Sequence, residues 1–401
     1  MILGCAIRYL DAWSAAPRPG DVRARGREGV PRTGHPSDPG VPVLAHLVAG
    51  TGRPAAAAAA ARAVAVWAKS AGRGPAHPGL YDGGLAGTLV GLRLGARLHP
   101  ALHRAADRVA HHLTEGAATR EHRPKGVTFP DYDLIVGPAG TLLALHAGAR
   151  PDATRVAPLT DRLTALCDSD DLWRLRTDGY TDHPQLAWLQ GRINTGMGHG
   201  VAGVVTALTA AVRHPDGVSP GTALALRRAT RWLVRQSYDD ARALRTWAGA
   251  GLDGPPPPGA SARQAWCYGT PGIAWALWDA ADALGDREAA DWAEATFTTL
   301  VAQYDEGFHL FGDRPGDLLG LCHGAAGVLA VADAFARHAR LPAAAALRGR
   351  LTRHIADRLP AGHAVADHHP GLLTGLPGTL CALLTAVHDA SRAWLPCLGL
   401  R

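Results

Sequence analysis

The chain has 401 residues, of which 47% are hydrophobic and 19% charged, a balance that allows a large buried core and excludes disorder throughout. Lys and Arg (41) exceed Asp and Glu (35) only slightly, and the basic residues are scattered without interleaved aromatics, so no nucleic-acid partner is expected. Six cysteines are too few for a disulfide scaffold in a chain of this length, which favours a reducing, cytoplasmic environment.

The first part of the chain is rich in Gly, Pro and Arg and has no helical periodicity between residues 11 and 42. We therefore expect a flexible N-terminal segment over residues 1–42 and a single domain over residues 43–401. The apolar start, Met1–Ile7, lacks a basic region and is too short for a signal peptide. The longest run without charge, Pro370–Val387, is interrupted by Gly and Pro, which predicts a buried loop and helix and no transmembrane segment.

A G-x-x-G motif followed by roughly a dozen small and apolar residues is repeated along the rest of the chain. Successive first glycines are 51 to 69 residues apart, a period that fits one pair of helices with its connections. The six copies begin at Gly84, Gly137, Gly200, Gly269, Gly324 and Gly375.

The segments between these glycines alternate in character. Those directly after the motif, such as Val204–Val212, are apolar all round and must be covered on every side. Those that follow, such as Thr222–Ser237 and Arg287–Gln303, carry charges on one face and would form an outer layer. Strand patterns are hard to find. The sequence therefore predicts an all-α fold, an α/α toroid.

Thiols and imidazoles stand at matching positions before the glycines. Cys267 and Cys322 lie two residues before the first glycine of their repeats, and His199 and His323 lie one residue before theirs. Equal positions in successive repeats of a closed ring face the same central opening, so these side chains should converge. Two Cys and one His form a ligand set for Zn²⁺ that leaves a fourth position open, as in catalytic sites. We interpret Cys267, Cys322 and His323 as zinc ligands.

Three short motifs at these positions resemble the lanthionine synthetase C-like (LanC) family over roughly Leu80 to the C-terminus. They are Trp266-Cys267-Tyr268-Gly269, Cys322-His323-Gly324 and Gly198-His199-Gly200. The resemblance implies a toroid of seven helical pairs. Since six motifs are counted, six to seven pairs are expected, and Val43–Ser70 is the candidate for part of a pair without the motif.

The resemblance also implies residue roles and a reaction. Cys267, Cys322 and His323 would hold zinc, His199 would be a catalytic acid/base, and Asp133 and Arg263 would complete the site. Asp131 is a nearby competitor for the carboxylate role. The implied reaction is a zinc-dependent addition of a peptide cysteine thiol to dehydroalanine or dehydrobutyrine.

In that reaction the metal would favour the thiolate of the substrate, which is the nucleophile. His199 would protonate the resulting enolate, Arg263 would offset its charge, and Asp133 would orient His199 or accept the thiol proton. The partner is a dehydrated precursor peptide. A dehydratase and an export transporter are further expected partners, and a complex with them would bring this cytoplasmic chain to the membrane.

Two features could serve substrate binding. The spacing between repeats points to insertions at Asp168–Arg192, with Trp173, Tyr180 and Trp188, and at Gly249–Gly259; peptide capture and simple packing explain the aromatics equally well. Tyr268 is expected to pack. A second metal site at His363, His368 and His369 is disfavoured, because one carboxylate and no Cys accompany them.

Three alternative functions remain open. A glycosidase with an α/α barrel needs two carboxylates at the scissile bond, and the acidic residues here do not recur at the motif positions. Zinc prenyltransferases share a toroid and a thiol-activating metal, but include a carboxylate ligand. A zinc-binding peptide scaffold without turnover would not need His199, Asp133 and Arg263.

Overall fold

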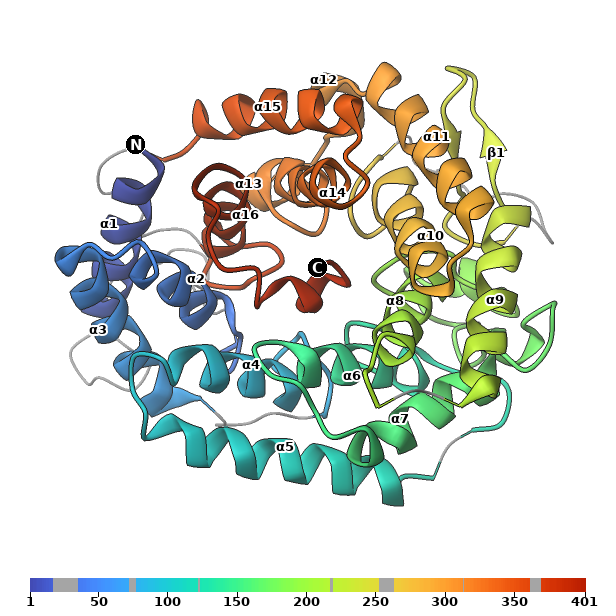
Figure 1. Cartoon of the computed structure of the whole chain (residues 1–401), viewed down its shortest axis with the longest axis horizontal. Helices are drawn as coiled ribbons and strands as arrows, with labels where there is room; N and C mark the ends of the chain where they lie inside the picture. Colours follow the sequence, from blue (N-terminus) through green and yellow to red (C-terminus); the bar gives the residue numbers. More distant parts are fainter. Residues whose placement is uncertain are drawn as a thin grey trace.

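The computed structural model describes residues 1–16, 35–71, 77–121, 123–216, 219–251, 263–312, 314–360 and 369–401. In this part of the chain, helices form a ring with an inner and an outer layer (Figure 1). The two strands, β1 (Tyr238–Asp239) and β2 (Arg245–Thr246), make a short antiparallel ladder outside the ring. The predicted all-α toroid is confirmed.

The inner layer consists of the apolar helices. Because an outer helix that returns along the ring wall separates each inner helix from the next, all inner helices run in the same direction. Six of them begin directly after the first glycine of a motif, as the repeat predicts. The inner helices are α2 (Gly40–Ala49), α4 (Leu85–Gly95), α6 (Pro138–His146), α8 (Val201–Val212), α10 (Thr270–Leu284), α14 (Ala325–His338) and α16 (Leu376–His388).

The outer layer consists of amphipathic helices that bury one face against the inner layer. Several begin where a side chain accepts a backbone N–H, as Asp152 does from Thr154 (2.9 Å) and Asp286 from Ala289 (3.1 Å). The outer helices are α1 (Ile2–Ala15), α3 (Pro54–Ser70), α5 (Leu102–Thr119), α7 (Ala153–Leu166), α9 (Pro220–Arg235), α11 (Arg287–Gln303) and α15 (Pro342–Ala356). Two short helices, α12 (Glu306–His309) and α13 (Pro315–Leu319), connect α11 to α14.

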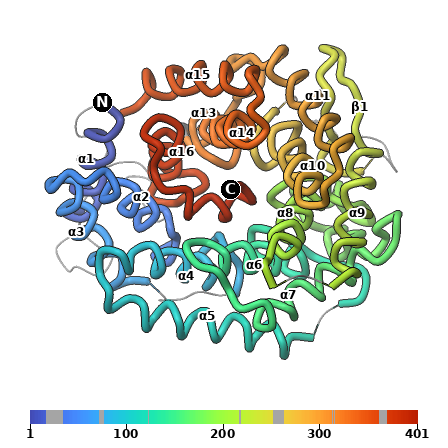
Figure 2. Tube along the Cα trace, viewed as in Figure 1, coloured from blue at the N-terminus to red at the C-terminus, as the bar shows by residue number. Residues whose placement is uncertain are grey.

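The two ends of the chain close the ring together. Helix α1 packs against α3 and α16, and the first and last helices lie side by side in the Cα trace (Figure 2). Leu3, Tyr9 and Leu10 of α1 are buried. Where a flexible segment was expected over residues 1–42, residues 2–15 instead form a helix whose apolar face packs against α3 and α16, and residues 40–42 begin α2; residues 17–34 lie outside the described residues.

This closure accounts for the seventh helical pair. Helices α16 and α1 form it, while α2 and α3 form the pair that lacks the G-x-x-G motif, as expected for the Val43–Ser70 region. The segment Pro370–Val387 forms a buried loop and most of α16. Among the described residues, no helix combines the length and apolar character that crossing a membrane requires.

The second glycine of each motif lets the inner helix approach the loop before it. A Cβ at any of these glycines would collide with a backbone carbonyl oxygen six or seven residues earlier. The pairs are Gly87 with Leu80, Gly140 with Leu134, Gly203 with Met197, Gly272 with Trp266, Gly327 with Leu321, and Gly378 with Leu372. The motif thus fixes the loop that carries each candidate functional residue.

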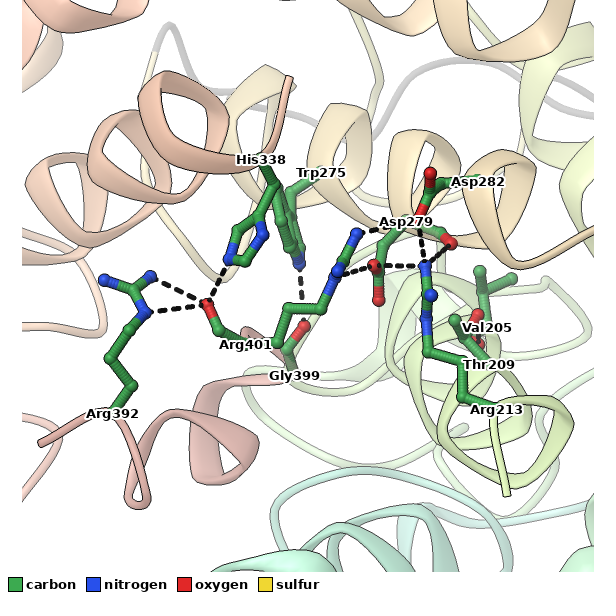
Figure 3. A network of polar contacts seen from close by, with 10 residues as sticks. All are labelled: Val205, Thr209, Arg213, Trp275, Asp279, Asp282, His338, Arg392, Gly399 and Arg401. Atoms are coloured by element: carbon green, nitrogen blue, oxygen red, sulfur yellow. Dashed lines mark hydrogen bonds and ion pairs between the residues drawn. The ribbon is translucent and has the colours of Figure 1, made fainter. Parts of the chain in front are cut away.

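The C-terminal residues lie toward the centre of the ring (Figure 1), and because they follow α16 they enter from the end where the inner helices terminate. Trp266 Nε1 donates to the Leu398 carbonyl (2.8 Å) and Trp275 Nε1 to that of Gly399 (2.9 Å). The guanidinium of Arg401 pairs with Asp279 and Asp282, which also bind Arg213 (Figure 3). This tail supports the inner wall beneath the loop that carries Cys267.

Candidate metal centre and adjacent acid–base pair

The loops that precede the inner helices are joined to one another around the ring. Each donates a backbone N–H to a carbonyl of the next loop, so equal positions in neighbouring repeats are held at one end of the toroid. The donors and acceptors are Leu80 and Ile135 (3.0 Å), Leu134 and Gly198 (3.1 Å), Met197 and Cys267 (2.8 Å), Cys267 and Cys322 (3.3 Å), and Cys322 and Leu373 (3.0 Å).

Asp38 connects this series to the pair that lacks the motif. Its Oδ1 accepts the N–H of Leu372 and of Gly40, both at 2.8 Å. Burial raises the pKa of this carboxyl to about 6. Sequence reasoning missed Asp38, because its partner Leu372 lies at the far end of the sequence.

The three predicted zinc ligands converge. The ligand atoms of Cys267, Cys322 and His323 all lie within 4.8 Å of one another, and Cys267 Sγ is 3.1 Å from His323 Nδ1. Zinc–sulfur bonds of about 2.3 Å and zinc–nitrogen bonds of about 2.0 Å place tetrahedral ligands at such separations. The donor set and its spacing therefore fit a Zn²⁺ ion, and it is the one group of this kind in the described part of the chain.

The surroundings of Cys267 favour its thiolate. Hydrogen bonds from the Cys322 thiol and from His323 lower the pKa of Cys267 to about 5, although burial acts against them. The same contact with Cys267 raises the pKa of His323. A buried negative sulfur beside an imidazole is the form in which such residues bind a metal.

His199 and Asp133 form an acid–base pair in the neighbouring repeats. His199 Nδ1 lies 2.5 Å from Asp133 Oδ2, and the other carboxylate oxygen accepts the N–H groups of Val136 and Gly137 at 2.8 Å. Asp133 is fully buried, and burial raises its pKa despite these bonds. Because Asp133 engages Nδ1, the orientation of the His199 ring is fixed.

Two aromatic residues that sequence reasoning missed hold His199 in place. Its ring stacks on Phe129, with 4.2 Å between the ring centroids. Tyr132 donates its hydroxyl to the His199 carbonyl (2.7 Å). Asp131, the predicted competitor of Asp133, instead accepts from Thr128 in a capping box. Phe129 could not be found from the sequence, because it does not occupy an equivalent position in the repeats.

Arg263 lies beside the metal ligands. Its Nη1 donates to the His323 carbonyl (3.4 Å) and its Nη2 to the Phe311 carbonyl (2.5 Å). The Phe311 ring stacks under the guanidinium, 3.9 Å from Cζ to the ring centroid. The structure thus brings Arg263 into the site, at the side of His323, and adds Phe311, which sequence reasoning missed.

Two other residues named in the sequence analysis, Tyr268 and Tyr180, pack near the site. Tyr268 accepts a hydrogen bond from Asn194 Nδ2 (2.8 Å) and packs against the loop of His199, in line with the expected packing role. In the Asp168–Arg192 insertion, Tyr180 is buried against Phe129.

Other expected features fall mostly beyond the described structure. Most of Gly249–Gly259, together with His363 and His368, lies outside the described residues. His369 Nδ1 accepts the Gly371 N–H (3.0 Å).

The ring of paired helices and this site define an α/α-toroid protein with a Cys–Cys–His group that could hold a metal ion at the N-terminal ends of its inner helices. The family model described as "Lanthionine synthetase C-like protein" matches residues 43–398, and the chain belongs to this family. Among solved structures, a nisin cyclase has the same fold, with a TM-score of 0.73 and 19% sequence identity over 90% of this chain and 91% of that one. No curated protein sequence matches.

Proposed function

We propose that this protein is a lanthionine cyclase, which joins a peptide cysteine to a dehydroalanine or dehydrobutyrine of a dehydrated precursor peptide. One observation carries the proposal: the group of Cys267, Cys322 and His323 lies at the same end of the toroid as the His199–Asp133 pair. Family membership and the fold of nisin cyclase support it, and they weigh against the glycosidase and prenyltransferase alternatives.

Cys267, Cys322 and His323 would hold the zinc ion, which, when bound, supplies a Lewis acid that favours the thiolate of the substrate cysteine. Three protein ligands leave the fourth position to the substrate. The hydrogen-bonded loops fix the ligands before the peptide arrives, so little reorganisation is needed at the moment of reaction.

His199 would deliver the proton that completes the addition. When the thiolate sulfur bonds to the β-carbon, the double-bond electrons move to the α-carbon and its carbonyl, giving an enolate. His199 Nε2–H protonates the α-carbon, and Asp133 stabilises the imidazolium that donates it and holds the ring in place. The imidazole then regains a proton from the medium, which has received the one lost by the thiol.

The surroundings would stabilise the developing negative charge. Seven inner helices point their N-termini, the positive ends of their dipoles, toward this end of the ring. Arg263 adds a full positive charge beside His323. Both would lower the energy of the enolate relative to the neutral peptide.

The test is incubation of the zinc-loaded protein with a dehydrated, cysteine-containing peptide. Ring formation leaves the mass unchanged, so loss of thiol alkylation is the readout. We expect alkylation to fall with time, and His199→Asn to slow this loss or change the stereochemical outcome. A wild-type protein that contains zinc but leaves every thiol open to alkylation would contradict the proposal. The same proposal includes a dehydrated precursor peptide as the natural substrate, and a dehydratase and an export transporter as partners.

A further inference from the structure

Three exposed apolar side chains stand on the connector between outer helix α11 and the ligand Cys322. Phe308, Phe311 and Leu318 are 45%, 42% and 38% exposed, and we refer to these three residues as the apolar ledge. They are three of the eight large hydrophobic side chains that are exposed in the described structure, while the other five lie at the start of α1, in the insertion 168–192, on α9 and on α16. Exposed apolar side chains that gather beside a reactive site mark a binding surface.

The connector holds these side chains in a fixed position. His309 and Leu310, which lie between the two phenylalanines, are buried, and His309 stacks on Tyr304 with 5.3 Å between the ring centroids. Farther along, Gly316 packs so tightly that a Cβ there would collide with the Thr374 carbonyl. Because the backbone is packed against the ring on both sides, Phe308 and Phe311 stay presented to solvent.

Each phenylalanine ring is held by an arginine. Arg242 Cζ lies 4.1 Å from the Phe308 ring centroid, and Arg263 Cζ lies 3.9 Å from that of Phe311. Such cation–π contacts orient the rings. Since Arg263 also binds the His323 carbonyl, one guanidinium joins the ledge to a candidate metal ligand. Phe311 therefore lies beside the candidate metal centre, where a peptide bound at that centre could contact it.

We propose that the apolar ledge binds the dehydrated segment of the substrate peptide and prefers it to the unmodified serine or threonine form. This inference rests on the proposed cyclase function. Loss of water converts a hydroxyl-bearing side chain into a planar C=C conjugated with its carbonyl, which is flatter and more apolar. A flat apolar group stacks on an aromatic ring, whereas a hydroxyl would lose its water there without a new partner.

The insertion Asp168–Arg192 carries one exposed aromatic ring, that of Trp173, which is the competing candidate for binding the peptide. Trp173 is 36% exposed and is covered by Arg174, 4.5 Å from Cζ to the ring centroid. No contact links Trp173 to the metal ligands in the described residues, whereas Phe311 is linked to His323 through Arg263. The ledge is therefore the better-placed surface, and Trp173 is a suitable comparison.

The experiment compares Phe308→Ala, Phe311→Ala and Trp173→Ala with the wild type. Leu224→Ala is the control, because Leu224 is 43% exposed on outer helix α9. Melting temperature and zinc content first establish that each variant is folded and loaded. Cyclisation is measured as kcat and KM. Binding is measured separately by fluorescence anisotropy, with labelled peptides in which alanine replaces every cysteine and the reactive position is either dehydroalanine or serine.

We expect the wild type to bind the dehydroalanine peptide more tightly than the serine peptide. Each phenylalanine variant should raise Kd and KM for the dehydrated peptide by about 2- to 10-fold and reduce that preference, as expected for loss of one aromatic contact. Trp173→Ala and Leu224→Ala should behave as the wild type.

The outcomes separate this proposal from the cyclase function. If the wild type closes rings while both phenylalanine variants keep wild-type KM and Kd, or if Trp173→Ala alone raises them, the ledge is not the docking surface. Equal wild-type affinity for the two peptides overturns the claimed preference. If the wild type closes no ring but binds the dehydrated peptide through Phe308 and Phe311, the cyclase function fails and the binding surface stands.

Discussion

Replacement of Gly327 by alanine should separate the two loops that carry the cysteine ligands. The new Cβ would lie 2.8 Å from Trp266 Cβ and would collide with the Leu321 carbonyl. These residues directly precede Cys267 and Cys322 and are fully buried, so neither loop can yield without moving its ligand. Overpacking of this kind costs about 1–3 kcal/mol. A shift of even a few tenths of an ångström takes a ligand away from the tetrahedral distances of zinc.

We therefore expect Gly327→Ala to lower both the free energy of unfolding and, by at least about tenfold, the affinity for zinc. The assays are thermal denaturation and zinc competition with a chromophoric chelator. Gly87→Ala is the matched control: its Cβ would collide with the Leu80 carbonyl, in a repeat without metal ligands, so it should lose stability but keep zinc affinity. Gly116→Ala, with open space around its Cβ, should be neutral or stabilising. Wild-type zinc affinity in Gly327→Ala, or an equal loss in Gly87→Ala, would refute the reasoning.

Four further predictions follow from the site and the ring. Metal analysis should find about one zinc per chain, and Cys322→Ala should lose it; retention of full zinc in that variant would exclude Cys322 as a ligand. Asp133→Asn should slow cyclisation by about 10- to 100-fold, because the imidazolium loses a charge-assisted hydrogen bond, and rates within twofold of wild type would contradict the pairing. Burial raises the pKa of Asp133 above 3.8, so the folded chain releases this proton at higher pH than the unfolded chain. The free energy of unfolding of the wild type, relative to that of Asp133→Asn, should thus fall as the pH rises from 3.8 to the pKa of Asp133 in the folded chain. Thermal melts at a series of pH values measure this fall, and a difference that stays constant with pH would contradict the raised pKa. Removal of residues 1–16 should lower the melting temperature and promote self-association, seen by size-exclusion chromatography, because it uncovers α3 and α16; an unchanged melting temperature would mean that α1 is dispensable.

The convergence of Cys267, Cys322 and His323 could be predicted from the sequence because the repeat itself encodes their position. A glycine begins each inner helix after α2, and the loop before it is tied to the next loop by backbone hydrogen bonds. Residues at the same distance from their glycines, such as Cys267 and Cys322, are therefore neighbours in space. The offset of a residue from its glycine therefore indicates where its side chain lies in the ring. The number of residues between Cys267 and Cys322 does not indicate this by itself.

Contacts outside the repeat could not be predicted in this way. Helix α1 packs against α16 as well as α3, and its residues alone carry no sign of a helix that lies more than 350 positions away. Phe311 contacts Arg263 from the connector between α11 and α14, which is not part of the repeated motif. Phe129 contacts His199 from a short turn that has no periodic pattern. These contacts are set by the packing of the whole ring, so local patterns of polarity do not report them.

The direction of the inner helices explains why the chemistry gathers at one end of the toroid. All seven N-termini meet at the end that carries Cys267, Cys322 and His199, where their dipoles favour thiolates and would favour the enolate of the proposed reaction. The opposite end collects the C-termini, and basic side chains such as Arg93 and Arg337 occupy the last turns there. The tail that fills the centre also brings Arg401 to this end. A negatively charged intermediate placed at the C-terminal end would face seven unfavourable dipoles, so a reaction through an enolate belongs at the end where the glycine motifs place the metal ligands.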